Sequence, residues 1–138
     1  MQSSELPEDV REFLRHRIVS FEQLEVLLLL RRERAGRWDV ASLSARLRIS
    51  ETLIVTALGG LVASGLVRPW PQDEPAQYLY GVENEHLDAT IGSLETTYRK
   101  QPIQIIRQMS GDAIERVRNS ALRIFADAFI VRRDKNRG

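Results

Sequence analysis

Histidines, cysteines and paired carboxylates are the side chains that most often carry catalysis or hold metals, and this chain has few of them. It has no cysteine, and its two histidines, His16 and His86, lie on different segments. The adjacent carboxylates at 73–74 fall in a turn-rich loop, where solvated charge is the ordinary interpretation. The glycine pair at 59–60 lacks the Gly-x-x-x-x-Gly-Lys pattern that cradles phosphates. We therefore predict a protein that is not an enzyme and that holds no metal and no cofactor.

The composition is that of an ordinary globular domain. With 138 residues, 43% of them hydrophobic and 28% charged, the chain fits one domain with an elaboration. Its longest apolar run, Val26 to Leu30, is far shorter than the roughly 20 residues that span a bilayer. The first residues are acidic and lack the apolar core of a signal peptide. Together with the absence of cysteine, this predicts a cytoplasmic protein without membrane contact.

The net charge of +1 hides an uneven distribution. Residues 71–98 hold six acidic residues and no Lys or Arg, whereas residues 99–138 hold ten basic residues and four acidic ones. Residues 20–70 hold seven arginines and five acids. Such a split indicates surfaces that prefer different partners. The most basic stretch is the tail, which contains Arg132, Arg133, Lys135 and Arg137.

Two helices are predicted at the start of the chain. Apolar residues at helical spacing over 10–18, behind Pro7, predict a short amphipathic lead-in helix. Ser20 is a good N-cap for a second helix, and Gln23 completes a capping box. Gly36 is the expected stop. The four leucines at 27–30 point in all directions around this helix, so it must be covered on more than one side.

The next segments alternate between short helices and turns. Trp38 predicts a short strand and Asp39 an N-cap for a helix that carries Leu43 and Leu47. Ser50 caps a helix over 51–64, whose expected apolar face is Leu53, Ile54, Ala57, Leu58, Leu61 and Val62. Gly65 is expected to end that helix in the left-handed conformation. Residues 66–68 then lead into a loop that starts with Pro69 and is followed by a strand over 78–82.

This order resembles a known superfamily. The run Leu58-x-x-Leu61-x-x-x-Gly65-Leu66-Val67, preceded by Leu43-x-x-x-Leu47-x-Ile49-Ser50, looks like the winged helix-turn-helix superfamily, as in MarR-like and PadR-like regulators. The resemblance covers roughly residues 20–83 and departs from the pattern at Arg48, where such proteins often have glycine. It implies a mainly α fold with a winged-helix core and a two-stranded wing. The expected segments are an N-terminal lead-in at 1–19, the winged-helix domain at 20–83 and C-terminal helices at 84–138.

The helix at 51–64 would be the recognition helix, and its outward face is unusual for one that binds DNA. That face presents Thr52, Val55, Thr56, Gly59 and Ala63, without the Arg, Lys, Asn or Gln that make most base contacts. The acids at 73–74 would repel phosphates. The residues that could contact DNA are Arg46, Arg48, Ser50 and Arg68, with Arg34, Arg37 and the basic tail nearby.

The same small residues suit close packing against a protein. Two functions therefore stay open at this point. One is a bacterial-type transcription-associated regulator that is dimeric and binds DNA. The alternative is a protein–protein interaction adaptor that does not bind DNA.

The last third of the chain predicts more helix. Asn84 can cap a helix through Tyr98, Pro102 opens another segment, and residues 110–112 are expected to break the chain before a last helix at about 113–133. The apolar residues of that helix recur at alternating spacings of three and four. They predict a homodimer or, as the other possibility, a cover for the leucine-rich helix; the set is Ile114, Val117, Ala121, Ile124, Phe125, Ala128 and Val131.

Overall fold

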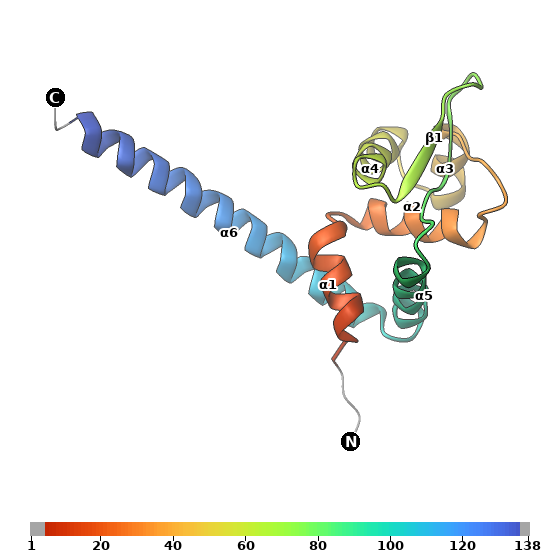
Figure 1. Ribbon diagram of the computed structural model, residues 1–138, viewed down its shortest axis with the longest axis horizontal. Helices are drawn as coiled ribbons and strands as arrows, with labels where there is room; N and C mark the ends of the chain where they lie inside the picture. Colours follow the sequence, from red (N-terminus) through yellow and green to blue (C-terminus); the bar gives the residue numbers. More distant parts are fainter. Residues whose placement is uncertain (1–4, 136–138) are drawn as a thin grey trace.

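A computed structural model describes the backbone of residues 5–135 and the side chains of residues 5–128. Within this range the chain is mainly helical, with six helices and one two-stranded antiparallel sheet (Figure 1). The elements in chain order are α1 (Glu8–Arg17), α2 (Phe21–Arg32), α3 (Val40–Leu47), α4 (Glu51–Ala63), β1 (Val67–Trp70), β2 (Gln77–Tyr80), α5 (Glu85–Lys100) and α6 (Pro102–Lys135).

Four of the helices begin at the N-caps that the sequence predicts. Ser20, Asp39, Ser50 and Asn84 each accept a hydrogen bond from the backbone N–H three residues on. The capping box at Ser20 is wrong in one detail, since the Gln23 side chain accepts from the N–H of Val19 at 2.9 Å and not from that of Ser20. These caps satisfy backbone donors that helix starts otherwise leave unpaired.

The leucine-rich helix α2 is covered on several sides, as its sequence requires. Residues 26–30 are all buried. Helices α3 and α4 and strand β2 pack on it. Helix α5 is tied to it by polar contacts, among them the Tyr98 hydroxyl, which donates to Glu25 at 2.8 Å. Burial and this hydrogen bond raise the pKa of Tyr98 to about 12.

Helix α4 buries a narrower face than expected. Ile54, Ala57, Leu58 and Leu61 are buried, but the Leu53 side chain is 47% exposed and Val62 only half-buried. Gly65 ends the helix with φ +78°, which confirms the left-handed conformation expected there. Arg48, at the end of α3, also has a positive φ of 58°. Arginine therefore adopts the conformation that glycine supplies more easily.

The strands of the hairpin extend farther into the expected loop than the sequence suggests. Strand β1 continues through Pro69 to Trp70, where a loop was expected, and pairs with β2 in the register Val67↔Tyr80 and Trp70↔Gln77. Proline is tolerated because β1 is an edge strand, which pairs with β2 on one side only. Trp38 forms the expected short strand, a bridge to Tyr78 with hydrogen bonds of 2.9 and 2.7 Å.

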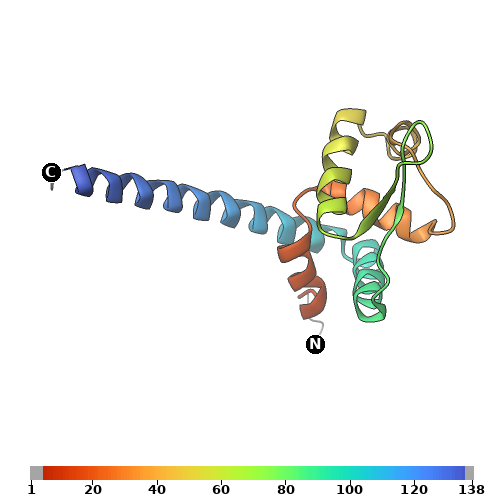
Figure 2. The same cartoon turned by 45° about the horizontal axis from the view of Figure 1, so that its top comes forward.

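The break expected at residues 110–112 is wrong, because α6 is one helix from Pro102 to Lys135. A single glycine costs a helix only about 1 kcal/mol, and the neighbouring residues compensate. Ile105 and Met109 are buried where α6 packs on α1 and α5, and the Gln108 amide donates to Asp112 one turn later at 2.9 Å. Beyond this contact α6 leaves the rest of the molecule as a rod (Figures 1 and 2).

One core joins these elements. Its buried residues come from the lead-in helix α1, from α2–α4, from the hairpin, from α5 and from the first turns of α6. The segments before and after 20–83 therefore contribute to the same core as the segment between them. No helix among residues 5–135 is long and apolar enough to cross a bilayer.

Candidate interaction surfaces

The outward face of α4 consists of small side chains, as the sequence predicts. Thr52, Val55, Thr56, Gly59 and Ala63 are all exposed. The Thr56 hydroxyl donates to the Thr52 carbonyl of its own helix at 3.2 Å. This surface therefore offers methyl groups and backbone, with no basic side chain among these five residues.

The two glycines of α4 have different reasons to be small. A Cβ at Gly60 would collide with the side-chain amide of Gln23, which is buried beneath it. A Cβ at Gly59 would meet nothing within 4 Å. The position of the buried Gln23 side chain therefore favours a glycine at 60, whereas no neighbour favours one at 59.

Most of the arginines that were expected to contact DNA already pair with side chains of the chain itself. Arg46 lies 3.2 Å from a Glu33 carboxylate oxygen and stacks over Trp38 at 5.9 Å, and Arg68 pairs with Glu83. Arg48 is exposed and has no ion pair among the described residues. Ser50, between these arginines and α4, has its hydroxyl occupied as the N-cap.

The two arginines near the hairpin are also engaged. Arg34 lies 3.6 Å from Asp88 and over the Tyr80 ring at 5.3 Å, while Arg37 lies over Trp70 at 4.6 Å. The loop that joins the strands, residues 71–76, is exposed and carries the two adjacent acids. It extends away from the core at the tip of the hairpin (Figure 1). A phosphate backbone near this tip would meet negative charge.

The sequence did not predict a polar cluster that lies between α2, β2 and α5. Arg31 bridges Asp88 at 3.0 Å and Glu95 at 3.4 Å, and the Tyr80 hydroxyl donates to Asp88 at 2.7 Å. Burial and the bond to Asp88 raise the pKa of Tyr80 well above its ordinary value. The bond from Tyr80, helped by Arg31, lowers the pKa of Asp88. The partners are far apart in sequence, so only the fold brings them together.

The projecting part of α6 carries the expected apolar residues on an uncovered helix. The side chains of Ile114, Val117 and Ile124 are 59%, 70% and 69% exposed. Phe125 is 70% exposed, and Ala121 and Ala128 are exposed as well. None of these residues covers α2, so the interpretation of this helix as an intramolecular cover is wrong.

The remaining expected residues lie at the end of the chain. Val131, Arg132, Arg133 and Lys135 belong to the helical backbone of α6, but their side chains lie outside the described residues. Arg137 lies outside the described residues altogether.

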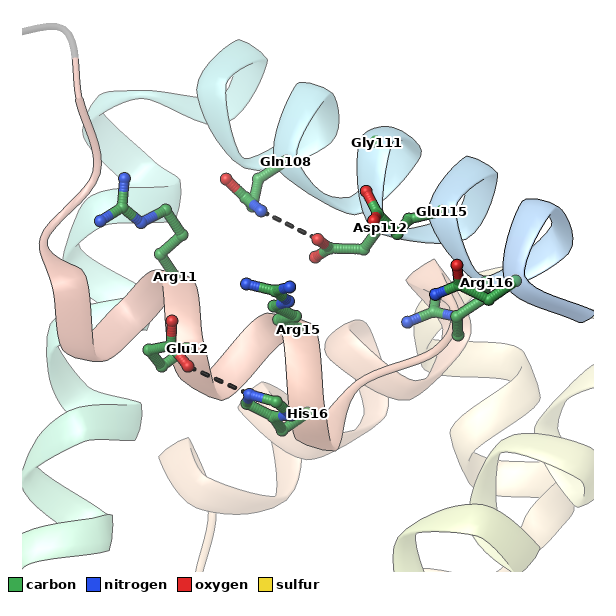
Figure 3. A pocket seen from close by; sticks show the side chains of 10 residues that line it. Arg11, Glu12, Arg15, His16, Gln108, Gly111, Asp112, Glu115 and Arg116 are labelled. Carbon is green, nitrogen blue, oxygen red and sulfur yellow. Dashed lines mark hydrogen bonds and ion pairs between the residues drawn. The ribbon is translucent and has the colours of Figure 1, made fainter.

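A hollow between α1 and α6 is a second feature that the sequence did not reveal (Figure 3). It has a volume of about 560 Å³. Its lining consists of Arg11, Glu12, Arg15 and His16 of α1 and of Gln108, Gly111, Asp112, Glu115, Arg116 and Asn119 of α6. Asp112 is 9% exposed and its Oδ2 has no hydrogen-bond partner.

The two histidines lie on different helices, α1 and α5. His16, on the rim of the hollow, contacts Glu12 at 3.0 Å, and His86 is exposed near the start of α5. In the part of the chain that is described, no three His, Asp or Glu side chains are grouped so that they could hold an ion. The chain matches no family model, no curated protein and no solved structure.

Proposed function

We propose that this chain is a non-enzymatic winged-helix adaptor, dimeric through α6, that binds another protein with the outward face of α4. The arrangement of α2, α3, α4 and the hairpin supports the winged-helix assignment. Helix α4 packs on both α2 and α3, a tight turn at 48–50 separates α3 from α4, and β1 follows α4 directly. This is the order in which helix-turn-helix and wing follow each other in that superfamily.

The single observation that carries the protein-binding proposal is Gly59. A glycine inside a helix costs about 1 kcal/mol relative to alanine, and the packing of the chain does not require it here. A partner whose backbone approaches α4 closely would require it. Thr52, Thr56 and Ala63 leave the same space on either side.

The dimer proposal rests on Ile114, Val117 and Ile124. Large apolar side chains exposed on one side of a helix, within a row of apolar residues spaced by three and four, are typical of helices that pair with another helix. A second copy of the same chain offers a matching stripe, and most soluble oligomers are symmetric dimers of this kind. The small residues Ala121 and Ala128 in the same row would let the two helices approach each other.

Affinity capture from the native cell tests the adaptor. We compare the wild type with Gly59→Leu, and use Ala45→Leu on the exposed side of α3 as the matched control. Wild type and Ala45→Leu should retain one defined protein after nuclease treatment, and Gly59→Leu should lose it. Retention of the protein by Gly59→Leu, or capture of nucleic acid alone, would show that the α4 face is not a protein interface.

A DNA-binding regulator is the second candidate, and Arg48 favours it. This arginine is exposed, has no ion pair among the described residues and lies three residues before the first residue of α4. A helix N-terminus and a nearby arginine are suited to a phosphate. We rank this function second because Arg34, Arg46 and Arg68 are already paired with carboxylates.

A further inference from the structure

We infer that the hollow between α1 and α6 binds a small zwitterion of the α-amino acid class, with its ammonium group on Asp112 and its carboxylate on Arg15 and Arg116. The inference is independent of the proposed function, because it concerns neither the face of α4 nor the apolar side of α6.

Asp112 indicates that the ligand has a cationic group. Its side chain is more than nine-tenths buried, and Gln108 donates to only one of its two oxygens, Oδ1. Oδ2 is buried without a hydrogen-bond partner. A buried carboxylate oxygen is costly unless a donor reaches it. Oδ2 has almost no accessible surface, so an ammonium group reaches it only by entering between α1 and α6, where its three donors and opposite charge would complete this site.

Arg15 and Arg116 indicate that the ligand also has an anionic group. Arg15 extends from α1 toward Asp112 and Gln108, and Arg116 lies one turn farther along α6 (Figure 3). Neither arginine forms a hydrogen bond or ion pair with any described residue, whereas Arg11 on the same rim pairs with Glu8 at 3.5 Å. Two unpaired guanidinium groups at one opening are suited to a carboxylate, which accepts bidentate hydrogen bonds from arginine.

The mixture of charges favours a ligand that carries both signs. A free anion would be repelled by Asp112 and by Glu115 beside it, and a free cation by the arginines. A ligand with both charges close together meets neither obstacle. A volume of about 560 Å³ lies within the range of small-molecule pockets and accepts a free amino acid with its side chain.

Gly111 is a third, independent observation. It lies inside α6, where glycine weakens a helix relative to alanine, and it lines the hollow. A Cβ at this position would meet nothing within 4 Å, so the packing of the chain does not require glycine. A larger side chain there would enter the hollow and compete with a ligand for the same space.

Binding to the full chain is measured by thermal denaturation and by calorimetry, with each of the twenty common amino acids in turn. We expect at least one of them to raise the melting temperature saturably and to bind at one site per chain. Asp112→Asn and Arg15→Gln should each weaken that binding by about tenfold or more, since each removes a charge-assisted hydrogen bond. Gly111→Phe should abolish it by filling the hollow.

Arg99→Gln is the matched control, since Arg99 lies on α5 and pairs with Glu95 outside the hollow; it should bind like the wild type. The melting temperature of each variant without ligand shows whether it folds. The inference is overturned if no amino acid shifts the wild type at millimolar concentration. It is also overturned if folded Gly111→Phe or Asp112→Asn responds as the wild type does.

Discussion

The phenol of Tyr80 on β2 donates a 2.7 Å hydrogen bond to Asp88 on α5, and the same carboxylate oxygen accepts from Arg31 on α2. One oxygen thus joins three elements that are separate in sequence. The bond from Tyr80 lowers the pKa of Asp88 from its ordinary value of 3.8. The charged form of Asp88 is therefore more favourable in the folded protein than in the unfolded chain.

This lowered pKa predicts an acid-sensitive contribution to stability. A carboxylate whose pKa is lower in the folded protein stabilises the fold at pH values above its pKa in the unfolded chain. This contribution is lost as the pH falls through the pKa that the group has in the folded protein. The wild type should therefore be more stable than Asp88→Asn at pH 7, by about 1–3 kcal/mol, and the difference should shrink below about pH 4. Urea denaturation at both pH values measures it. A difference that does not change with pH would mean that Asp88 is not charged in this cluster.

Gly65 predicts a cost that arises from the backbone alone. Its φ of +78° is unfavourable for any side chain, although a Cβ would meet no atom within 4 Å. Gly65→Val should lower the free energy of unfolding by more than about 1 kcal/mol, as measured by chemical denaturation. An unchanged stability would contradict the left-handed end of α4.

At Gly111, unlike at Gly65, we expect a substitution to raise the free energy of unfolding. It lies inside α6, without a positive φ and with open space around it. Gly111→Ala should raise the free energy of unfolding by about 0.5–1 kcal/mol. A loss of stability would instead indicate a break in the helix at 110–112, as the sequence alone suggests.

The proposed dimer predicts that a charge on the apolar side of α6 dissociates it. Because Ile124 is exposed in the single chain, Ile124→Asp should leave the fold intact but bury an unpaired charge in the pair. Light scattering should report a dimer for the wild type and a monomer for the variant. Arg123→Asp, one residue earlier and turned away from this side, is the control and should remain dimeric. A wild type that is monomeric at high concentration would disprove the dimer.

The distribution of charged residues predicts weak binding to duplex DNA. Affinity falls with salt by a log–log slope of about −0.9 for each phosphate neutralised, and few free arginines lie near α4. Binding should be indifferent to sequence and should be mostly lost on deletion of residues 132–138, while Thr56→Arg should strengthen it. Fluorescence anisotropy across a salt series measures this. A tight, sequence-specific complex that survives the deletion but is lost on Thr52→Ala or Thr56→Ala would favour the DNA-binding regulator.

The sequence predicts the structure correctly where a residue acts on its immediate neighbours. The caps at Ser20, Asp39, Ser50 and Asn84 and the turn at Gly65 are of this kind, since each depends on backbone groups within a few residues. The break that residue propensities predict at 110–112 does not occur, because buried Ile105 and Met109 and the bond from Gln108 to Asp112 outweigh the glycine.

The sites that sequence reasoning missed depend on distant partners. Arg31 meets Asp88 and Glu95 only after α2 and α5 have come together, and Arg15 faces Asp112 only after α1 and α6 have packed. No local pattern distinguishes these charges from ordinary solvated ones. The pairing of Arg46 and Arg68 with carboxylates could not be anticipated for the same reason.

The unbroken course of α6 fixes a rotational phase as well as a length. From Asp112 to Lys135 the helix advances about 35 Å at 1.5 Å per residue, and each residue turns it by roughly 100°. Inserting one residue just after Asn119 would therefore rotate the outer part of the helix by that angle relative to the core. Inserting seven would return it to nearly the same direction, about 10 Å farther out. The number of residues in this rod, and not only their identity, sets where the face of α4 points relative to whatever holds the far end.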